Sequence, residues 1–348
     1  MLLLTINISK SPSFNSRIKI TVAAGLMGVV IIYFNSMDFY YPLEYNLMEI
    51  TDSLATDTKD APEWFHSAIS QNPRKENLQH QLGNLAYQVW DRDKAKDIII
   101  LIHGTGAHKK WWDPIAPLIN KDFSIIAPDL PGMGESDHRQ EYNFEGFSEA
   151  LVAMMYQENI INNGQKIYLV GHSLGGHVAG FMASEFPDLF HGVVMIDSPI
   201  RPPTYDYDKH QSTGPLRKIK YYPDKVSILE RFRLMPPQEC DNSWYLRYIA
   251  ENSIYNVKEG WRWRFDDKLF ATLRRLHNYE FQFKCPALFI AGGKSLLLES
   301  KIMKYIREAF KDSMDVEVIE GAAHHVPLDS PLELVSLINN YLQEWGKK

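Results

Sequence analysis

A serine stands in a glycine-rich turn at Gly171-His172-Ser173-Leu174-Gly175. Residues 166–170, which precede the turn, are apolar and β-branched and predict a buried strand, whereas residues 176–186 carry apolar side chains at helical spacing. A tight strand-to-helix turn leaves little room for side chains beside the serine, so glycine is needed there and the hydroxyl projects above the sheet. A serine hydroxyl is a weak nucleophile and needs a neighbouring base to take its proton. The turn therefore predicts a nucleophilic Ser173, provided that the fold supplies a base.

Apolar strands alternate with amphipathic helices on both sides of this turn. The expected strands are 97–102, 123–127, 166–170, 192–196, 286–291 and 315–319. The expected helices are 111–119, 144–158, 175–186, 300–310 and 331–345. Residues 78–90, interrupted by a glycine, predict a hairpin of two further strands. Alternation of this kind, with strands apolar on both faces, predicts an α/β fold in which helices cover both faces of a mostly parallel sheet.

The alternation stops between residues 199 and 284 and then resumes, which predicts an insertion into one fold rather than a separate C-terminal domain. The inserted segment is rich in aromatic side chains, among them Tyr205, Tyr207, Trp244, Tyr245, Tyr248, Trp261, Trp263 and Phe265. We expect some of these rings to form the insertion's own core and others to line an apolar, water-poor pocket.

Four motifs occur in order among these elements: His103–Gly106, Asp129–Ser136, the serine turn, and Gly321–Pro331. Together they resemble the α/β-hydrolase superfamily over roughly residues 75–346, and within it the cap-bearing serine hydrolases of the esterase type. The resemblance implies an α/β-hydrolase fold with a helical cap inserted after the sixth strand. It also implies that Ser173 is the catalytic nucleophile.

The resemblance implies that His324 is the general base. In the family an acidic residue follows the base by five positions and a proline by seven, and Asp329 and Pro331 fit His324 rather than His325. His325 is then expected either to line the pocket or to face solvent.

The acid that orients the base departs from the common family pattern. Its usual place is the loop after strand 286–291, but Ser295 stands there, and Glu299 further on is expected to cap the next helix. A second family solution places the acid at the end of the preceding strand, where Asp197 stands. We therefore assign the acid to Asp197, with Glu299 as the alternative. The backbone N–H groups of Thr105 and Leu174 are expected to form the oxyanion hole.

The N-terminal segment 1–36 differs from the rest of the chain. Its residues 20–34 are uncharged and mostly apolar, basic residues precede them, and acidic residues follow. This pattern predicts a membrane anchor with the catalytic domain outside the cytoplasm; the alternatives are export after signal cleavage and a buried helix. Residues 37–60 are expected to be a linker, residues 61–198 and 285–348 the core, and residues 199–284 the cap.

Composition narrows the class of protein further. The 348 residues are 45% hydrophobic, enough for one large domain with an insertion or for two domains. A formal net charge of −6 without any basic run argues against nucleic acid as a partner. Cys240 and Cys285 are too far apart in the sequence for a zinc knuckle, and they are either one disulfide or two free thiols.

These observations predict a serine hydrolase that cleaves a carboxylic ester of a small or medium apolar acid through an acyl-enzyme. No cofactor or metal is expected, because the chemistry needs only the serine, the base and the acid. The same residues serve a lactone, thioester, amide or C–C bond equally well, and these bonds remain alternatives. Two non-catalytic alternatives are a ligand receptor on this fold and a membrane-tethered interaction protein. The sequence leaves the oligomeric state open.

Overall fold

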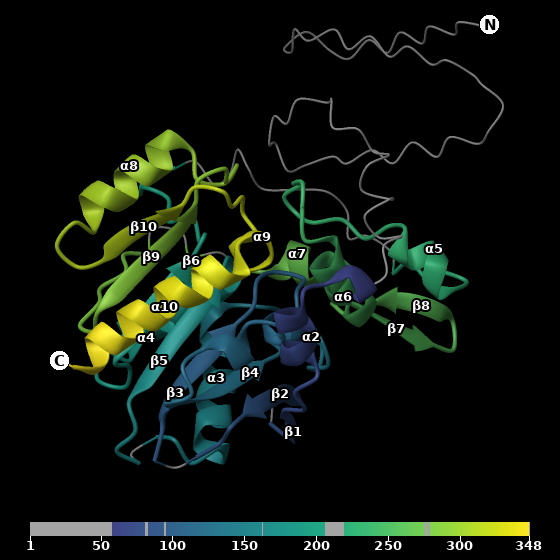
Figure 1. Cartoon of the computed structure of the whole chain (residues 1–348), viewed down its shortest axis with the longest axis horizontal. Helices are drawn as coiled ribbons and strands as arrows, with labels where there is room; N and C mark the ends of the chain where they lie inside the picture. The colour runs from purple at the N-terminus through teal and green to yellow at the C-terminus, as the bar shows by residue number, and fades with distance from the viewer. Residues whose placement is uncertain are drawn as a thin grey trace, which may run out of the picture.

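The computed structural model describes residues 58–80, 83–93, 95–161, 163–205, 219–274, 276 and 279–347. Its centre is an eight-stranded sheet with the order β1-β2-β4-β3-β5-β6-β9-β10 (Figure 1). The strands are β1 (Arg74–Leu78), β2 (Leu85–Trp90), β3 (Asp97–Ile102), β4 (Phe123–Pro128), β5 (Ile167–His172), β6 (Gly192–Ile196), β9 (Ala287–Gly292) and β10 (Asp315–Ile319). Strand β2 pairs antiparallel with both β1 and β4, and the pairs from β4 to β10 are parallel. The expected mostly parallel sheet is confirmed.

Alternating side chains of each central strand enter two different hydrophobic cores. In β3, Ile98, Ile100 and Ile102 join the core on one face of the sheet. Ile99 and Leu101 join the core on the opposite face. Burial on both sides explains why this strand is a continuous apolar run rather than an alternating one.

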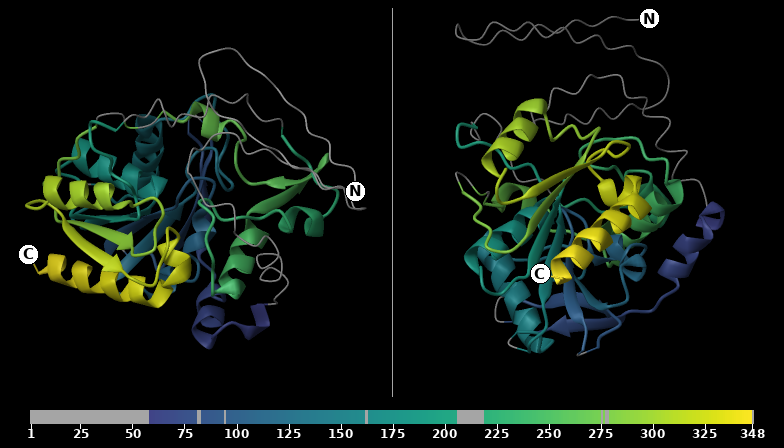
Figure 2. Two further views of the ribbon diagram at one scale, coloured as in Figure 1. Left: turned by 90° about the horizontal axis from the view of Figure 1, so that it is seen from above. Right: turned by 60° about the vertical axis from the view of Figure 1, so that its left-hand side comes forward.

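Helices cover both faces, as the sequence predicts (Figure 2). The first face is covered by α3 (Phe144–Gln157), α4 (Leu174–Glu185) and α8 (Ser300–Ala309), whose apolar side chains belong to the first core. The second face is covered mainly by α10 (Pro331–Gly346). The left view of Figure 2 shows α10, in yellow, on one side of the sheet and the teal helices α3 and α4 on the other.

The helix expected over residues 111–119 is wrong. Two short 3-10 segments take its place, η2 (Lys109–Trp112) and η3 (Ala116–Leu118). Pro114 and Pro117 lie in this stretch and cannot donate backbone hydrogen bonds, and a proline disfavours the helical conformation of the residue before it. The expected hairpin is present, but its first strand β1 begins earlier, at Arg74. Strand β1 is largely polar and partly exposed, so hydrophobicity did not mark it.

The insertion between β6 and β9, which we call the cap, contains a small sheet as well as helices. Its described elements are α5 (Lys225–Leu229), α6 (Ser243–Asn252), β7 (Ile254–Val257), β8 (Gly260–Trp263) and α7 (Leu269–Thr272). Strands β7 and β8 pair antiparallel as a separate two-stranded sheet. The cap is therefore mixed, where a helical one was expected.

Aromatic rings connect the cap to the chain that leads into the main sheet. Helix α2 (Glu63–Ile69) follows the short segment η1 (Thr58–Asp60) and places the buried ring of Phe65 against the cap. The Phe65 centroid lies 4.5 Å from that of Trp244 and 5.5 Å from that of Tyr245. These residues share one cluster with Trp111 of the main domain. Many of the cap's aromatic residues thus form a core of their own.

Two features named from the sequence need separate mention. The segment 1–36, expected to be an anchor, lies outside the described residues. Within the described ranges, no helix combines the length and the apolar character that crossing a membrane requires. Cys240 and Cys285 are both free and partly buried.

Candidate active site

Ser173 occupies the junction between β5 and α4. Its backbone has φ 54°, in the left-handed region that side chains other than glycine rarely adopt. Its N–H donates to the Ile196 carbonyl at 2.9 Å, which fixes the turn against β6. A Cβ placed at Gly171 would come within 2.1 Å of the Gly175 carbonyl oxygen, so this close approach requires glycine. The turn has the geometry that the sequence predicted, with the serine side chain partly exposed.

Asp197 lies directly after β6, the strand next to β5, and its carboxylate is completely buried. The carboxylate oxygen Oδ1 lies 2.7 Å from Nδ1 of His324. The other oxygen, Oδ2, accepts the N–H of Gly292 at 2.8 Å. Like Ser173, Asp197 has a positive φ, of 44°. The structure thus brings Asp197 and His324 together across a long stretch of sequence.

Ser295 explains how the loop after β9 is used. Its hydroxyl donates to Oδ1 of Asp197 at 2.7 Å, the same oxygen that His324 contacts. The residue in the family's usual acid position therefore holds the displaced acid in place. Sequence reasoning noted this serine only as a missing aspartate and did not find its contact. The one sequence feature that pointed to this contact was the presence of both an aspartate directly after β6 and a serine in the loop after β9.

Glu299, the alternative acid, is exposed at the N-cap of α8. It is Asp197 that bonds to Nδ1 of His324. The structure therefore brings Asp197 to the imidazole and leaves Glu299 at an exposed helix terminus.

The loop that carries His324 is tied to the cap through Asp329, in the short helix α9 (Val326–Asp329). The Asp329 carboxylate accepts the N–H of Ala323 at 2.8 Å, and Gln238 of the cap donates to both of its oxygens at 2.8 Å. Gln238 in turn accepts the N–H of His325 at 3.0 Å. Burial raises the pKa of Asp329 to about 6. Asp329, five positions after His324, thus shapes the backbone around His324. The sequence did not reveal its partner Gln238 in the cap.

The two N–H groups expected in the oxyanion hole flank the serine. Within the described part of the chain, neither Thr105 nor Leu174 donates its N–H to another group, which leaves both available to a ligand. Leu174 is buried at the start of α4, and Thr105 is exposed on the loop after β3. A Cβ at Gly104 would lie 3.2 Å from the Cβ of Ser173, so this loop runs directly beside the nucleophile.

A buried ion pair between Lys109 and Asp129 fixes the loop after β3. Lys109 donates from its backbone N–H to one oxygen of Asp129 at 2.6 Å and from its ammonium group to the other at 2.5 Å. Burial by itself raises the pKa of Asp129, but the charge of Lys109, the neighbouring His103 and the two hydrogen bonds from Lys109 together outweigh that effect, and the net pKa is lowered. The carboxylate at the start of the Asp129–Ser136 motif therefore holds the loop after β3 in place through Lys109.

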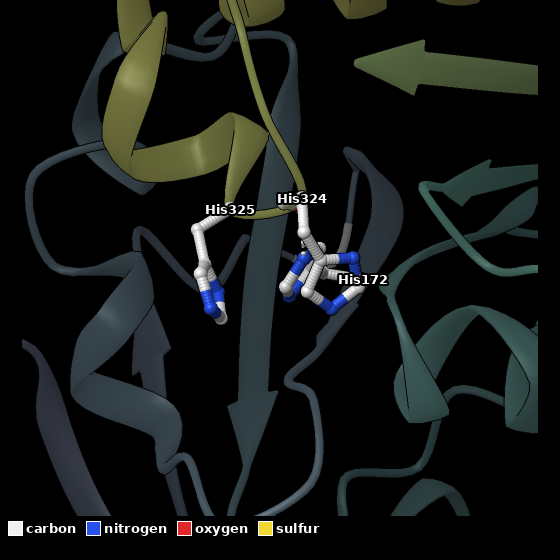
Figure 3. Close-up of side chains that lie close together, drawn as sticks. All are labelled: His172, His324 and His325. Carbon is white, nitrogen blue, oxygen red and sulfur yellow. Dashed lines mark hydrogen bonds between the residues drawn. The ribbon is translucent and has the colours of Figure 1, made fainter. Parts of the chain in front are cut away.

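Two further histidines lie beside His324 (Figure 3). His172 is buried, and its Nε2 lies 2.9 Å from the carbonyl oxygen of His324. Burial and the neighbouring His324 lower the pKa of His172 to about 3. His325 is also buried, so the alternative in which it faces solvent is wrong. Its ring lies 5.5 Å from that of Trp111, and burial lowers its pKa well below the usual value.

Aromatic side chains of the cap approach the loop after β3. A Cβ at Gly106 would lie 3.7 Å from the ring of Phe270 and 3.9 Å from that of Phe265. These two rings meet edge to face at 5.8 Å, and Phe270 is 54% exposed. The exposed ring of Phe270 thus provides an apolar surface beside this loop.

The structure thus gathers Ser173, the bonded pair of Asp197 and His324, and the N–H groups of Thr105 and Leu174 at the carboxyl-terminal edge of the sheet. The sequence profile of the alpha/beta hydrolase fold matches residues 97–331. The chain belongs to this family.

Individual relatives of this α/β-hydrolase are distant but cover most of its length. It is 23% identical over 282 residues to the sn-1-specific diacylglycerol lipase ABHD11 of Mus musculus, covering 78% of this chain and 90% of that protein. It is 22% identical over 282 residues to the monoacylglycerol lipase ABHD6 of Mus musculus, covering 76% and 80%. Among solved structures, E-2-(acetamidomethylene)succinate hydrolase superposes with a TM-score of 0.64 at 20% identity, covering 78% of this chain and all (100%) of that one.

Proposed function

We propose that this α/β-hydrolase is a serine hydrolase that cleaves a carboxylic ester of an apolar acyl substrate through an acyl-enzyme. The observation that carries the proposal is the bond of 2.7 Å between Asp197 and Nδ1 of His324 at the sheet edge where Ser173 stands. An acceptor on Nδ1 directs the lone pair of the imidazole to Nε2, which is the state that a general base requires.

In the proposed reaction Ser173 attacks the ester carbonyl while Nε2 of His324 takes the hydroxyl proton. The N–H groups of Thr105 and Leu174 stabilise the negative oxygen of the tetrahedral intermediate. His324 then gives its proton to the leaving alcohol, and an acyl group remains on Ser173. Water, activated by the same imidazole, releases the acid and restores the serine. Asp197 stays ionised and stabilises the imidazolium that forms in each half of the reaction.

Two observations support an apolar ester as the substrate. Phe265 and Phe270 flank the loop that carries Thr105 and provide an apolar surface there. The relatives ABHD11 and ABHD6 are named as lipases of diacylglycerol and monoacylglycerol, which favours an acyl ester over an amide or a C–C bond. A receptor without turnover would need neither a buried acid behind the imidazole nor a strained serine, and both features have an energetic cost.

We also propose that residues 1–36 anchor the enzyme in a membrane, with the catalytic domain outside the cytoplasm. The apolar run 20–34 and the charges on either side of it support this orientation. An anchor would keep the active site close to lipid esters, which concentrate in membranes.

The deciding experiment combines fluorophosphonate labelling with turnover of a short p-nitrophenyl ester. Ser173→Ala should abolish both signals. Asp197→Asn should lower kcat by about 10⁴-fold, because the imidazole then loses its orienting acceptor. Glu299→Gln is the matched control and should retain the activity of the unmodified protein. Labelling that persists in Ser173→Ala would overturn the proposed nucleophile, and a loss confined to Glu299→Gln would overturn the proposed acid.

A further inference from the structure

Three imidazoles, those of His172, His324 and His325, form a buried group that we call the histidine cluster (Figure 3). One ring nitrogen from each lies within 4.8 Å of the other two. The ring centroids are 4.9 Å apart for His172 and His324, and 4.8 Å apart for His324 and His325. The proposed hydrolysis needs only one of these rings. The other two therefore call for another explanation.

His325 is unsatisfied within the described part of the chain. Neither of its ring nitrogens makes a hydrogen bond of ordinary geometry to another described group, although its exposed fraction is only 6%. A buried polar group without a partner is costly and commonly marks the place of a ligand, an ion or water. The ring packs against Trp111, and its polar neighbour outside the cluster is the backbone of Met235, so turning towards the other two imidazoles would give up only that contact.

The other two rings are held in the way that metal-ligating histidines are. His324 presents Nδ1 to the Asp197 carboxylate, and His172 presents Nε2 to a backbone carbonyl, each at hydrogen-bond distance. A carboxylate and a carbonyl can only accept, so each of these nitrogens carries the proton and the other keeps a lone pair. Ligating histidines characteristically donate their second N–H to such partners, which orients the ring.

We propose that the histidine cluster binds one divalent transition metal ion, Zn²⁺ in the first instance, and that the bound ion inhibits the enzyme. Three imidazoles with an open fourth position suit Zn²⁺, whereas Mg²⁺ requires oxygen ligands. Zn–N bonds of about 2.0 Å place ligand nitrogens about 3.3 Å apart, so the rings must rotate inward to bind the ion. Inhibition follows because the ion occupies the lone pair that His324 needs as a base. The binding stands on geometry alone, and only the inhibition rests on the proposed function.

The test starts from full-length protein freed of metal with a chelator. ZnCl₂ is titrated by calorimetry, and the absorption of added Co²⁺ reports the ligand geometry. We expect one ion bound per chain, a fall in p-nitrophenyl ester turnover of at least about tenfold at saturation, and recovery on adding chelator. MgCl₂ is the control and should neither bind nor inhibit. Absence of Zn²⁺ binding would overturn the site, and binding without inhibition would overturn its effect on the reaction.

Two variants separate the cluster from unspecific metal binding. His325→Gln removes an imidazole that the proposed hydrolysis does not use, and should weaken Zn²⁺ binding by at least about tenfold while metal-free turnover persists. His172→Gln keeps an N–H donor for the His324 carbonyl and should weaken Zn²⁺ binding to a similar degree. This second variant keeps the test valid if His325→Gln misfolds. His138→Gln, at a histidine whose side chain is 43% exposed, is the matched control and should bind Zn²⁺ as the unmodified protein does. Unchanged binding in both cluster variants would overturn the proposal.

Ser173→Ala distinguishes a failure of this inference from a failure of the proposed function. The serine is not one of the proposed ligands, so this variant should bind Zn²⁺ with unchanged affinity although its turnover is lost. If Ser173→Ala retains turnover, the proposed nucleophile is wrong while the calorimetric result still decides the metal site.

Discussion

At the scale of single residues, the most informative feature is the hydrogen bond from Ser295 to the Asp197 carboxylate. The proposed acid, Asp197, follows β6, and Ser295, in the family's common acid position, donates a hydrogen bond to it. Both Ser295 and His324 reach the same carboxylate oxygen at 2.7 Å. Positions 197 and 295, the two places where the family can carry the acid, therefore lie side by side in the structure, although they are far apart in the chain.

This convergence predicts that the acid can be moved. Asp197→Ser alone should reduce turnover by several orders of magnitude, as loss of the triad acid does. Adding Ser295→Asp should recover about 10-fold to 100-fold of that loss, because a carboxylate is returned close to Nδ1 of His324. Steady-state kinetics of the single and double variants provide the measurement. The control is the double variant Asp197→Ser with Ser295→Asn, because asparagine has the shape of aspartate without its charge. Equal rates for the two double variants would refute the prediction that a carboxylate at position 295 can replace Asp197.

The sequence predicted those site residues whose signals are local. Gly171 is required by its contact with Gly175 within the turn, and Asp329 follows His324 closely because it binds the backbone of the same loop. The contacts from Ser295 to Asp197 and from Gln238 to Asp329 join segments that are distant in the chain. No local pattern encodes such contacts, so only the folded chain revealed them.

At the scale of elements, α6 of the cap is docked onto the main domain through a largely buried carboxylate. Asp113 accepts a hydrogen bond from Tyr248 of α6 at 2.5 Å and another from Gln88 of β2. The carboxylate follows the segment η2, in the stretch where the prolines prevented the expected helix. The irregular backbone there thus provides a contact surface for the cap.

The same carboxylate predicts a pH dependence of stability. Burial raises the pKa of Asp113 to about 6 from its ordinary value of 3.8, so between these values the folded state holds a proton that the unfolded chain has lost. Stability from this group therefore falls as pH rises through that window and is lost above it. The asparagine variant does not carry this penalty. The change in unfolding free energy caused by Asp113→Asn should therefore be more favourable, by about 1 to 2 kcal/mol, at about pH 7.5 than at about pH 4.

Urea unfolding at the two pH values measures that difference. Asp312→Asn, at an exposed carboxylate, is the control and should change stability equally at both. An Asp113→Asn effect that does not vary with pH would contradict the assigned ionisation.

Helix α7 of the cap predicts substrate preference. Phe270 lies in α7 with its ring exposed above the loop that carries Gly106. Phe270→Ala should raise KM for p-nitrophenyl esters of longer acyl chains by about 5-fold to 30-fold, corresponding to the loss of about 1 to 2 kcal/mol of apolar contact. Acetate esters, which are too short to reach the ring, should be affected little. A KM change that is equal for short and long chains would show that the ring does not contact the acyl group.

At the scale of the whole molecule, the proposed anchor and the catalytic domain are separable in the chain. The apolar run ends before residue 37, and the first described helical segment begins at Thr58. The stretch between them was predicted to be a linker. The domain limits proposed from the sequence follow these changes in composition.

Removal of the anchor should change location without changing chemistry. The full chain should sediment with membranes and need detergent for release, whereas a chain beginning at residue 37 should stay in the supernatant. Both should hydrolyse a water-soluble ester at the same rate, because the catalytic residues lie far along the chain. Fractionation with activity assays measures this, and the N-terminal mass of the mature protein distinguishes an anchor from a cleaved signal. A full chain that stays in the supernatant with its N-terminus intact would contradict the anchor.

The order of the proposed catalytic residues along the chain has a consequence for biosynthesis. Ser173 and Asp197 both leave the ribosome before the cap, but His324 follows β10 near the C-terminus. Folding during translation proceeds from the N-terminus, so the central strands are available long before the imidazole arrives. Nascent or prematurely terminated polypeptides would then carry a nucleophile without its base, and ester cleavage would begin only after translation has been completed.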